Sequence, residues 1–302
     1  MDLEFISGSG RKGVEKVFGE GMMEIVLGVI LNFVSGDLVC KQSVDAGTRG
    51  GRDSITSKVV SLCLRKSSKI PGQGPSAVSE KLLRIGFDIL KCLALPPSSS
   101  RGTLAVSGIF PSCARMISSG LRNAGTNNTA PRLRKAGSFL VRAEGALSLF
   151  VNATLDGEGR KAVFGDWSLF KKLIDDLIAV ERQLSMSLTR GLLLLIRNVC
   201  LDKNKSCVWS NKNWLNFILD SCVDDEKKIR AASLQCLHML LYKSEKAVAC
   251  VKEPENIKKI LMAETLVVKE GRNETMNLLD PKGDSDLIIA RSMQAVTSLM
   301  RN

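Results

Sequence analysis

The sequence predicts an all-α fold, an armadillo- or HEAT-like right-handed α-solenoid in which short helices stack side by side. The first observation is internal repetition: residues 145–156 align without a gap on residues 191–202, and six of the twelve positions are identical. The two copies begin 46 residues apart, a period typical of paired or tripled helices that stack into an array. The second observation is composition. Hydrophobic residues make up 44% of the chain and aromatic residues only 5%, so aliphatic side chains fill the core, as packing between helices favours.

The first 125 residues are predicted to form an irregular helical part with basic loops. Apolar residues at helical spacing predict helices at 21–34, 57–66, 77–95 and 104–121. The first of these is apolar on most of its faces, which is typical of a buried helix. Pro96 and Pro97 end the third helix, and Pro111 must break or open the fourth.

Residues 126–302 are predicted to form a regular armadillo-like repeat array. Short polar connections separate its predicted helices, and acidic residues stand at the start of two of them. Trp167, Trp209 and Trp214 lie at helix edges, where packing between repeats is favoured over a ligand cage. The predicted helices are 132–154, 167–182, 185–201, 212–222, 226–242, 255–269 and 285–300.

An asparagine recurs near the end of the repeated helix, as Asn152 and Asn198, whereas a third and weaker copy has Tyr242 in this register. Asn is poorly suited to a helix interior because its amide competes for backbone groups. The favoured interpretation is structural: the amide bonds unpaired carbonyls of a last helical turn, and Asn198→Ala costs only about 1 kcal/mol. In the alternative, both residues hold the backbone of a partner peptide, as regularly spaced asparagines of armadillo repeats do. Asp156 and Asp202, four residues further on, are predicted to be caps or turn residues.

Positive charge is concentrated in one stretch of this chain, whose net charge is +12. Residues 89–143 contain eight basic residues and no acidic one. The plain interpretation is a solvated face, and the functional one is a patch that binds an acidic protein partner. Nucleic acid is disfavoured because only Phe110 and Phe139 could stack on bases there. The candidate partner-binding residues of this stretch are Arg115, Arg122, Arg132, Arg134, Lys135 and Arg142.

No set of residues describes a catalytic or metal site. The nine cysteines occur singly, and the sole histidine, His238, lies within an apolar helix, where a core or groove position is expected. A zinc site needs several thiolate or imidazole ligands at close spacing, and a cysteine nucleophile needs a histidine nearby. Residues 7–13 are rich in glycine, but Val14 follows where a phosphate-binding loop needs Lys and then Ser or Thr. The chain is therefore predicted not to be an enzyme and to need no cofactor.

The expected location is the cytoplasm. An odd number of cysteines without a framework is typical of reduced thiols. The first five residues do not lead from a basic region into an apolar core, as a signal peptide would. The most apolar stretch, 22–34, is too short to span a bilayer and contains Glu24 and Asn32. No membrane insertion is expected.

Several segments of the second half have the order and spacing of a known family. They are Phe-Val-Asn-Ala-Thr-Leu-Asp-Gly-Glu-Gly-Arg-Lys at 150–161, Arg-Asn-Val-Cys-Leu-Asp-Lys-Asn-Lys at 197–205, and the segments 229–237, 240–247 and 290–301. On these residues, the stretch from Leu147 onward resembles the C-terminal end of the rotatin family, armadillo-like proteins of centrioles and basal bodies. The resemblance implies a non-enzymatic scaffold of the cytoskeleton that binds centriolar or other scaffold proteins and supports cilium assembly. The alternative is a generic armadillo-repeat cytosolic adaptor that binds an acidic protein partner.

Overall fold

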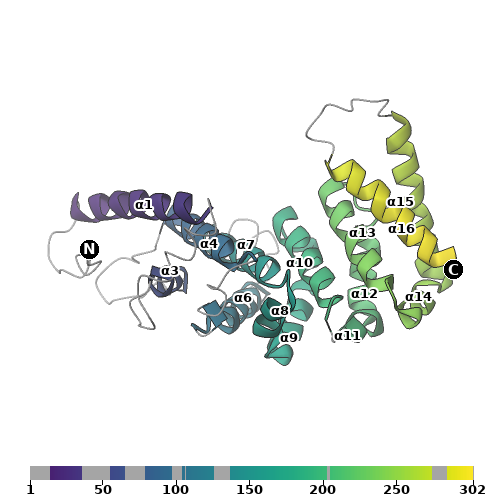
Figure 1. Ribbon diagram of the computed structural model, residues 1–302, viewed down its shortest axis with the longest axis horizontal. Helices are drawn as coiled ribbons and strands as arrows, with labels where there is room; N and C mark the ends of the chain where they lie inside the picture. The colour runs from purple at the N-terminus through teal and green to yellow at the C-terminus, as the bar shows by residue number, and fades with distance from the viewer. Residues whose placement is uncertain are drawn as a thin grey trace. The chain divides into compact units, whose positions relative to one another are not determined.

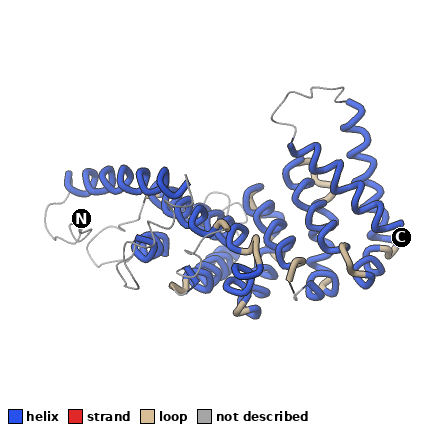
Figure 2. The backbone as a smooth tube through the Cα atoms, viewed as in Figure 1, coloured by secondary structure: helices blue, strands red, loops and turns tan. Residues whose placement is uncertain are grey.

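The computed structural model is helical throughout the residues that it describes. Every regular element in this part of the chain is a helix and none is a strand (Figure 2). This confirms the all-α class that the sequence predicts. The structure describes residues 14–35, 55–64, 79–96, 104–105, 107–125, 137–202, 205–273 and 284–301.

The chain divides into two compact units. The first consists of Met1–Ile117 and Lys135–Ala153, and the second of Ser118–Arg134 and Thr154–Asn302. This division follows packing, whereas the boundary near residue 125 follows composition, so the sequence boundary stays a prediction. The first unit contains α1 (Val14–Ser35), α3 (Ile55–Leu64), α4 (Glu80–Ala94), the start of α6 (Ile109–Gly125), and α7 (Gly137–Ala153).

Helices of the first unit form a row in which α4 packs against both α1 and α7, and α3 packs against α4 (Figure 1). The contact between α4 and α7 depends on a glycine. A Cβ atom added at Gly145 of α7 would lie 2.4 Å from Cγ of Phe87 on α4, much closer than carbon atoms approach without strain. Phe87 is itself buried, so the absence of a side chain at Gly145 allows α7 to pack directly against the Phe87 ring of α4.

The second unit repeats a triplet of helices. Its elements are α8 (Gly157–Phe164), α9 (Trp167–Ile178), the 3₁₀ turn Glu181–Gln183, α10 (Met186–Val199), α11 (Lys205–Ser210), α12 (Lys212–Ser221), α13 (Lys227–Leu241), α14 (Glu245–Val251), α15 (Pro254–Asn273) and α16 (Asp284–Arg301). From α9 to α13, each helix contacts the helix three places further along. Thus α13 packs against α10 and α16, α12 against α9 and α15, and α11 against α14 (Figure 1). Three helices per repeat is an armadillo-type arrangement. We call α10, α13 and α16 the third-helix row.

Short polar side chains determine where several helices begin. The hydroxyls of Ser79 and Ser185 accept hydrogen bonds from backbone N–H groups in the first turns of α4 and α10, over 3.3 Å in each case. Asp156 accepts one from the Gly159 N–H at 2.8 Å and so caps α8, which confirms the cap predicted there. Each bond satisfies an N–H that has no partner within its own helix. Asp202 lies in the turn before α11.

Six of the seven helices predicted in the second half begin and end within four residues of their predicted bounds, namely α9, α10, α12, α13, α15 and α16. Pro111 lies in the first turn of α6, where a proline N–H is not needed, so the predicted opening at this residue is a helix start. The helices α8, α11 and α14 are not among the predicted ones. Their lengths of eight, six and seven residues are too short to show a helical period.

The prediction that residues 21–34 form a buried helix is wrong. Of α1, Leu27 and Val34 are buried, whereas Ile25, Val29 and Phe33 are more than half exposed. The reason is geometric: α1 packs mainly against α4, and a helix with a neighbour on one face covers only the side chains of that face. No helix in the described part of the chain is long and apolar enough to cross a membrane.

Two of the three tryptophans, Trp167 and Trp214, pack between successive triplets, as the sequence predicts for all three. The rings of Trp167 and Trp214 meet edge to face with their centroids 6.3 Å apart. Trp214 is fully buried, and its indole N–H donates to Oδ1 of Asp175 at 2.6 Å. This bond gives the one polar atom of the indole a partner inside the core, and it ties α12 to α9.

Candidate functional site

The candidate site lies on the third-helix row, on the faces of α10 and α13 that remain uncovered. Residues that are buried on α10 fall on one side of the helix, and those that are not, including Arg190, Leu194 and Arg197, are spaced by three and four along the other side. On α13 the uncovered side carries Lys228 and Gln235, seven residues apart. Two adjacent helices therefore present neighbouring uncovered stripes.

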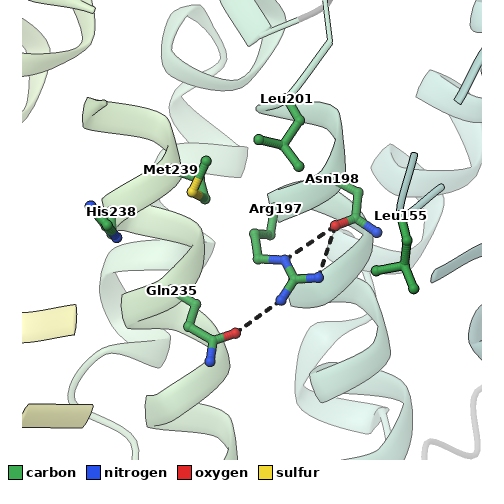
Figure 3. Close-up of a pocket in the computed structure, with 7 residues that line it drawn as sticks. All are labelled: Leu155, Arg197, Asn198, Leu201, Gln235, His238 and Met239. Atoms are coloured by element: carbon green, nitrogen blue, oxygen red, sulfur yellow. Dashed lines mark hydrogen bonds between the residues drawn. The ribbon is translucent and has the colours of Figure 1, made fainter. Parts of the chain in front are cut away.

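Between these stripes lies a pocket of about 310 Å³, which we call the α10–α13 groove (Figure 3). Two of its apolar residues, Leu155 and Leu201, are 40% and 42% exposed. Exposure of two leucines in one pocket leaves apolar surface in contact with water, and binding a partner side chain would remove that surface. The groove is lined by Leu155, Arg197, Asn198, Leu201, Gln235, His238 and Met239.

Arg197 bridges the two helices of the groove. Its Nε and Nη2 atoms donate to Oδ1 of Asn198 at 3.1 and 3.0 Å, and its Nη1 atom donates to Oε1 of Gln235 on α13 at 3.0 Å (Figure 3). Burial lowers the pKa of the Arg197 guanidinium, but an arginine remains a cation at neutral pH. Two of its five N–H groups are not needed for these bonds, and a bound group could accept hydrogen bonds from them.

Asn198 holds Arg197 in place from within the core. The side chain of Asn198 is fully buried, and its Nδ2 atom donates to Oγ1 of Thr154 at 2.8 Å. Thr154 lies in the turn that precedes α8, so the end of α10 is fastened to the start of its own triplet. A buried amide with partners at both ends fixes the direction of its oxygen, which is why that oxygen can hold the guanidinium.

Asn152 occupies the corresponding place in the first unit. Its Nδ2 atom donates to the carbonyl oxygen of Lys91 at 3.1 Å, which is one of the last four carbonyls of α4 and lacks an intrahelical donor. Asn152 thus bonds a last-turn carbonyl, as the structural interpretation predicts, although the carbonyl belongs to the neighbouring α4, whereas Asn198 bonds a hydroxyl instead of a carbonyl. A role of Asn152 and Asn198 in holding a partner stays a prediction.

The structure places two of the six basic candidates of residues 89–143. Arg115 is exposed on α6. Arg142 is half-buried on α7 near the thiols of Cys63 and Cys113, and burial lowers the pKa of its guanidinium. Arg142 is thus part of the packing of its unit. The side chains of Arg122, Arg132, Arg134 and Lys135 lie outside the described residues, and a basic patch formed by the six candidates stays a prediction.

Titratable side chains near the groove do not form a reactive set in the described residues. His238 is half-buried on α13, and its ring meets that of Tyr242 edge to face at 6.4 Å. No three His, Cys, Asp or Glu side chains in the described part of the chain are placed to hold a metal ion. Burial raises the pKa of Cys222 to about 12 and that of Cys236 well above the ordinary range. Both thiols are therefore protonated at neutral pH, whereas a nucleophilic cysteine acts as the thiolate.

Lys228, Gln235 and Met239 of the uncovered stripe are not among the residues that the sequence predicts for a site. The signal that could have found them is the break in hydrophobicity along α13, whose other faces carry Ile, Leu, Ala and Cys. The pattern that indicates this surface is the exposed stripe along each repeat helix and not the conspicuous asparagine at its end.

No family model matches the chain, and no curated protein matches its sequence. Among solved structures, an engineered protein superposes with a TM-score of 0.63 at 12% identity, covering 99% of this chain and 97% of its own. A designed armadillo repeat protein in complex with the peptide (KR)4 superposes with a TM-score of 0.59 at 10% identity, over 95% and 97% of the two chains. Computationally designed armadillo repeat proteins for modular peptide recognition give 0.59 at 11% identity, again over 95% and 97%. Identities this low establish the fold alone. The chain has an all-α, armadillo-like solenoid fold.

Proposed function

We propose that this protein is a non-enzymatic scaffold that binds an extended segment of a protein partner in the α10–α13 groove. The observation that carries the proposal is the combination of exposed apolar walls with fixed polar groups in one pocket. Leu155 and Leu201 can receive an apolar side chain, and Arg197 and Gln235 can orient a main chain that crosses them. Designed proteins with the same fold recognise peptides, as their names state, which supports the proposal.

The polar groups have the hydrogen-bonding capacity that an extended segment needs. Such a segment exposes unpaired N–H and C=O groups, which lose water on binding and must find new partners. Gln235 accepts from Arg197 through Oε1, and its Nε2 atom can donate to a carbonyl of the segment. The remaining N–H groups of Arg197 can do the same. Because Asn198 and Gln235 hold the guanidinium before binding, little side-chain entropy is lost when it is used.

A peptide-display experiment tests this site. The wild-type chain is expected to enrich peptides from a random library, and Met239→Glu in the groove is expected to reduce their capture at least about tenfold by placing a charge in an apolar contact. The matched control is Met262→Glu, because Met262 is 58% exposed on α15 and lies outside the groove. Equal loss with both variants, or no enrichment by the wild type, would contradict the proposal.

The resemblance of residues 147–302 to the rotatin family supports a finer proposal, in which the partner is a centriolar or other scaffold protein and the chain supports cilium assembly at basal bodies. A tagged chain expressed in ciliated cells is then expected to form foci that coincide with a centriole marker. The alternative is a cytosolic adaptor with the same groove. A diffuse cytosolic signal, together with intact peptide capture in vitro, would favour the adaptor and contradict the centriolar proposal.

A further inference from the structure

The third-helix row of the second unit differs in charge from most of the other helices of that unit. Neither α10 nor α13 contains an Asp or Glu, and residues 288–301 of α16 contain none either. The same stretches hold Arg190, Arg197, Lys228 and Arg291, among other basic residues. The row is therefore uniformly positive along the part whose side chains the structure describes.

Five other helices of the second unit, α8, α9, α12, α14 and α15, carry both signs, whereas the six-residue α11 carries Lys205 alone. Lysines of α9, α12, α14 and α15 alternate with acidic residues, and two of these pairs are close: Lys171 lies 2.8 Å from Asp175, and Lys259 lies 2.5 Å from Asp220. A surface in which each charge has an opposite neighbour has a weak field, and a surface of one sign has a strong one. Among the helices longer than six residues in this unit, the described part of the third-helix row is the one without acidic residues.

Two cations on this row lie beside the groove and are available to a partner. Arg190 is seven residues before Arg197 on α10, and Lys228 is seven residues before Gln235 on α13, so each shares a helical face with a residue that lines the groove. Both are exposed, and the structure records no ion pair for either among the described residues. The acidic residue nearest to Lys228 in the sequence is Glu226, which occupies the N-cap position of α13. Its negative charge there favours the start of the helix.

We propose that the groove and the cations beside it select an acidic, extended segment. This inference rests on the proposed function and names the chemistry of its partner. Adjacent helix axes are about 8–10 Å apart, and an extended chain advances about 3.3 Å per residue. Acidic side chains two or three residues apart can therefore meet cations on successive helices. A carboxylate that reaches Arg197 meets a half-buried, oriented guanidinium, where a charged hydrogen bond is stronger than at an open surface.

Nucleic acid fits the same charge less well. Single strands bind by stacking their bases on aromatic rings along a basic groove. No Phe, Tyr or Trp occurs in α10, in α13 or in residues 288–301 of α16. The exposed leucines of the groove offer aliphatic surface instead, which matches the side chains of a peptide. Nucleic acid binding is accordingly one of the outcomes that the experiment must distinguish.

Fluorescence anisotropy with three labelled peptides tests the inference on the whole chain. The acidic probe repeats Asp-Pro-Val over about twelve residues, because proline keeps it extended over a length that crosses three helices. In the neutral probe Asn replaces Asp, and in the basic probe Lys replaces it. The wild type is expected to bind the acidic probe at least about tenfold more tightly than the neutral one at low salt, and this difference should shrink as salt screens the charges.

Charge reversal identifies the surface responsible. The double variant R190E/K228E is expected to weaken binding of the acidic probe about tenfold and to strengthen binding of the basic one. The matched control is K172E/K246E, which makes the same change in net charge at exposed residues of α9 and α14 in the same unit. The control is expected to change affinity less than about threefold. Circular dichroism checks that both variants keep the wild-type helix content.

Several results would overturn the inference. Equal affinity for the acidic and neutral probes, or equal loss in the two double variants, contradicts acidic selection on this row. A single-stranded oligonucleotide of equal charge that binds more tightly and displaces the peptide indicates a nucleic acid partner instead. If library peptides bind in the groove without a preference for acidic residues, the inference fails and the scaffold function stands. If no peptide of any composition is enriched, the proposed function itself fails.

Discussion

Replacing Asn198 by alanine tests whether the buried Asn198 side chain stabilises the α10–α13 groove. The substitution removes the 2.8 Å bond to Thr154 and the two bonds that Oδ1 accepts from Arg197. A neutral hydrogen bond contributes about 1 kcal/mol, bonds to a charged group about 1.5–3 kcal/mol, and a buried hydroxyl left without its donor adds to the cost. We therefore expect a loss of about 2–4 kcal/mol in the free energy of unfolding, more than the roughly 1 kcal/mol that a surface cap would contribute.

Tryptophan fluorescence during urea unfolding measures this loss in the correct unit, because all three tryptophans of the chain lie between Thr154 and Asn302. A double-mutant cycle with Thr154→Val isolates the amide–hydroxyl bond and should give a coupling of about 1 kcal/mol. The matched control is Asn152→Ala, which removes one bond to a backbone carbonyl and should cost the first unit about 1 kcal/mol by circular dichroism. An Asn198→Ala variant within about 0.5 kcal/mol of wild type would refute the reasoning.

Three further perturbations follow from packing and burial. Gly145→Ala should destabilise the first unit by about 1–3 kcal/mol, because the added Cβ would clash with Phe87. The control is Gly28→Ala, whose Cβ meets nothing within 4 Å and should stabilise α1 by about 0.5–1 kcal/mol. Circular dichroism during urea unfolding compares the two variants. Leu195→Asp places a charge at a fully buried residue and should cost at least about 4 kcal/mol, so near-native fluorescence-detected unfolding would contradict the repeat assignment. Burial raises the pKa of Cys222 from 9.0 to about 12. The contribution of this thiol to stability is therefore complete below pH 9 and is lost between pH 9 and pH 12, by at most about 1.4 kcal/mol per pH unit. Unfolding free energies measured across this range should fall less steeply for Cys222→Ala.

The helices α7 and α10 could be predicted from the sequence because their signal is local. The copies at 145–156 and 191–202 contain the buried leucines that face the core, and a helical period shows which side of each helix is buried. Short helices gave no such signal. In α8, two glycines and three charged residues leave only Val163 and Phe164 as large buried residues, too few to define a period. Its start was nevertheless visible in Asp156, because capping is a property of neighbouring residues.

The hydrogen bonds that hold the groove together could not be predicted because they join residues far apart in the sequence. Asn198 bonds Thr154 across 44 residues, and Arg197 bonds Gln235 across 38. Asn is poorly suited to a helix interior, and the prediction that Asn198 lies near a helix end is confirmed, because α10 ends at Val199. Which atom its amide would meet depended on how successive triplets stack. The exposure of apolar side chains on α1 could not be predicted for the same reason, since the sequence of an apolar helix does not determine how many helices pack against it.

The bond between Arg197 and Gln235 also has a mechanical consequence. In a solenoid each repeat contacts only the next, so the array bends at the junctions between repeats. Arg197 spans one such junction, from α10 to α13, while Asn198 anchors it to the start of its own triplet. Bending that widens this junction stretches the bond and opens the groove at the same time. Curvature at this junction and occupancy of the groove are therefore coupled. A segment that binds in the groove is expected to reduce bending of the array at this junction.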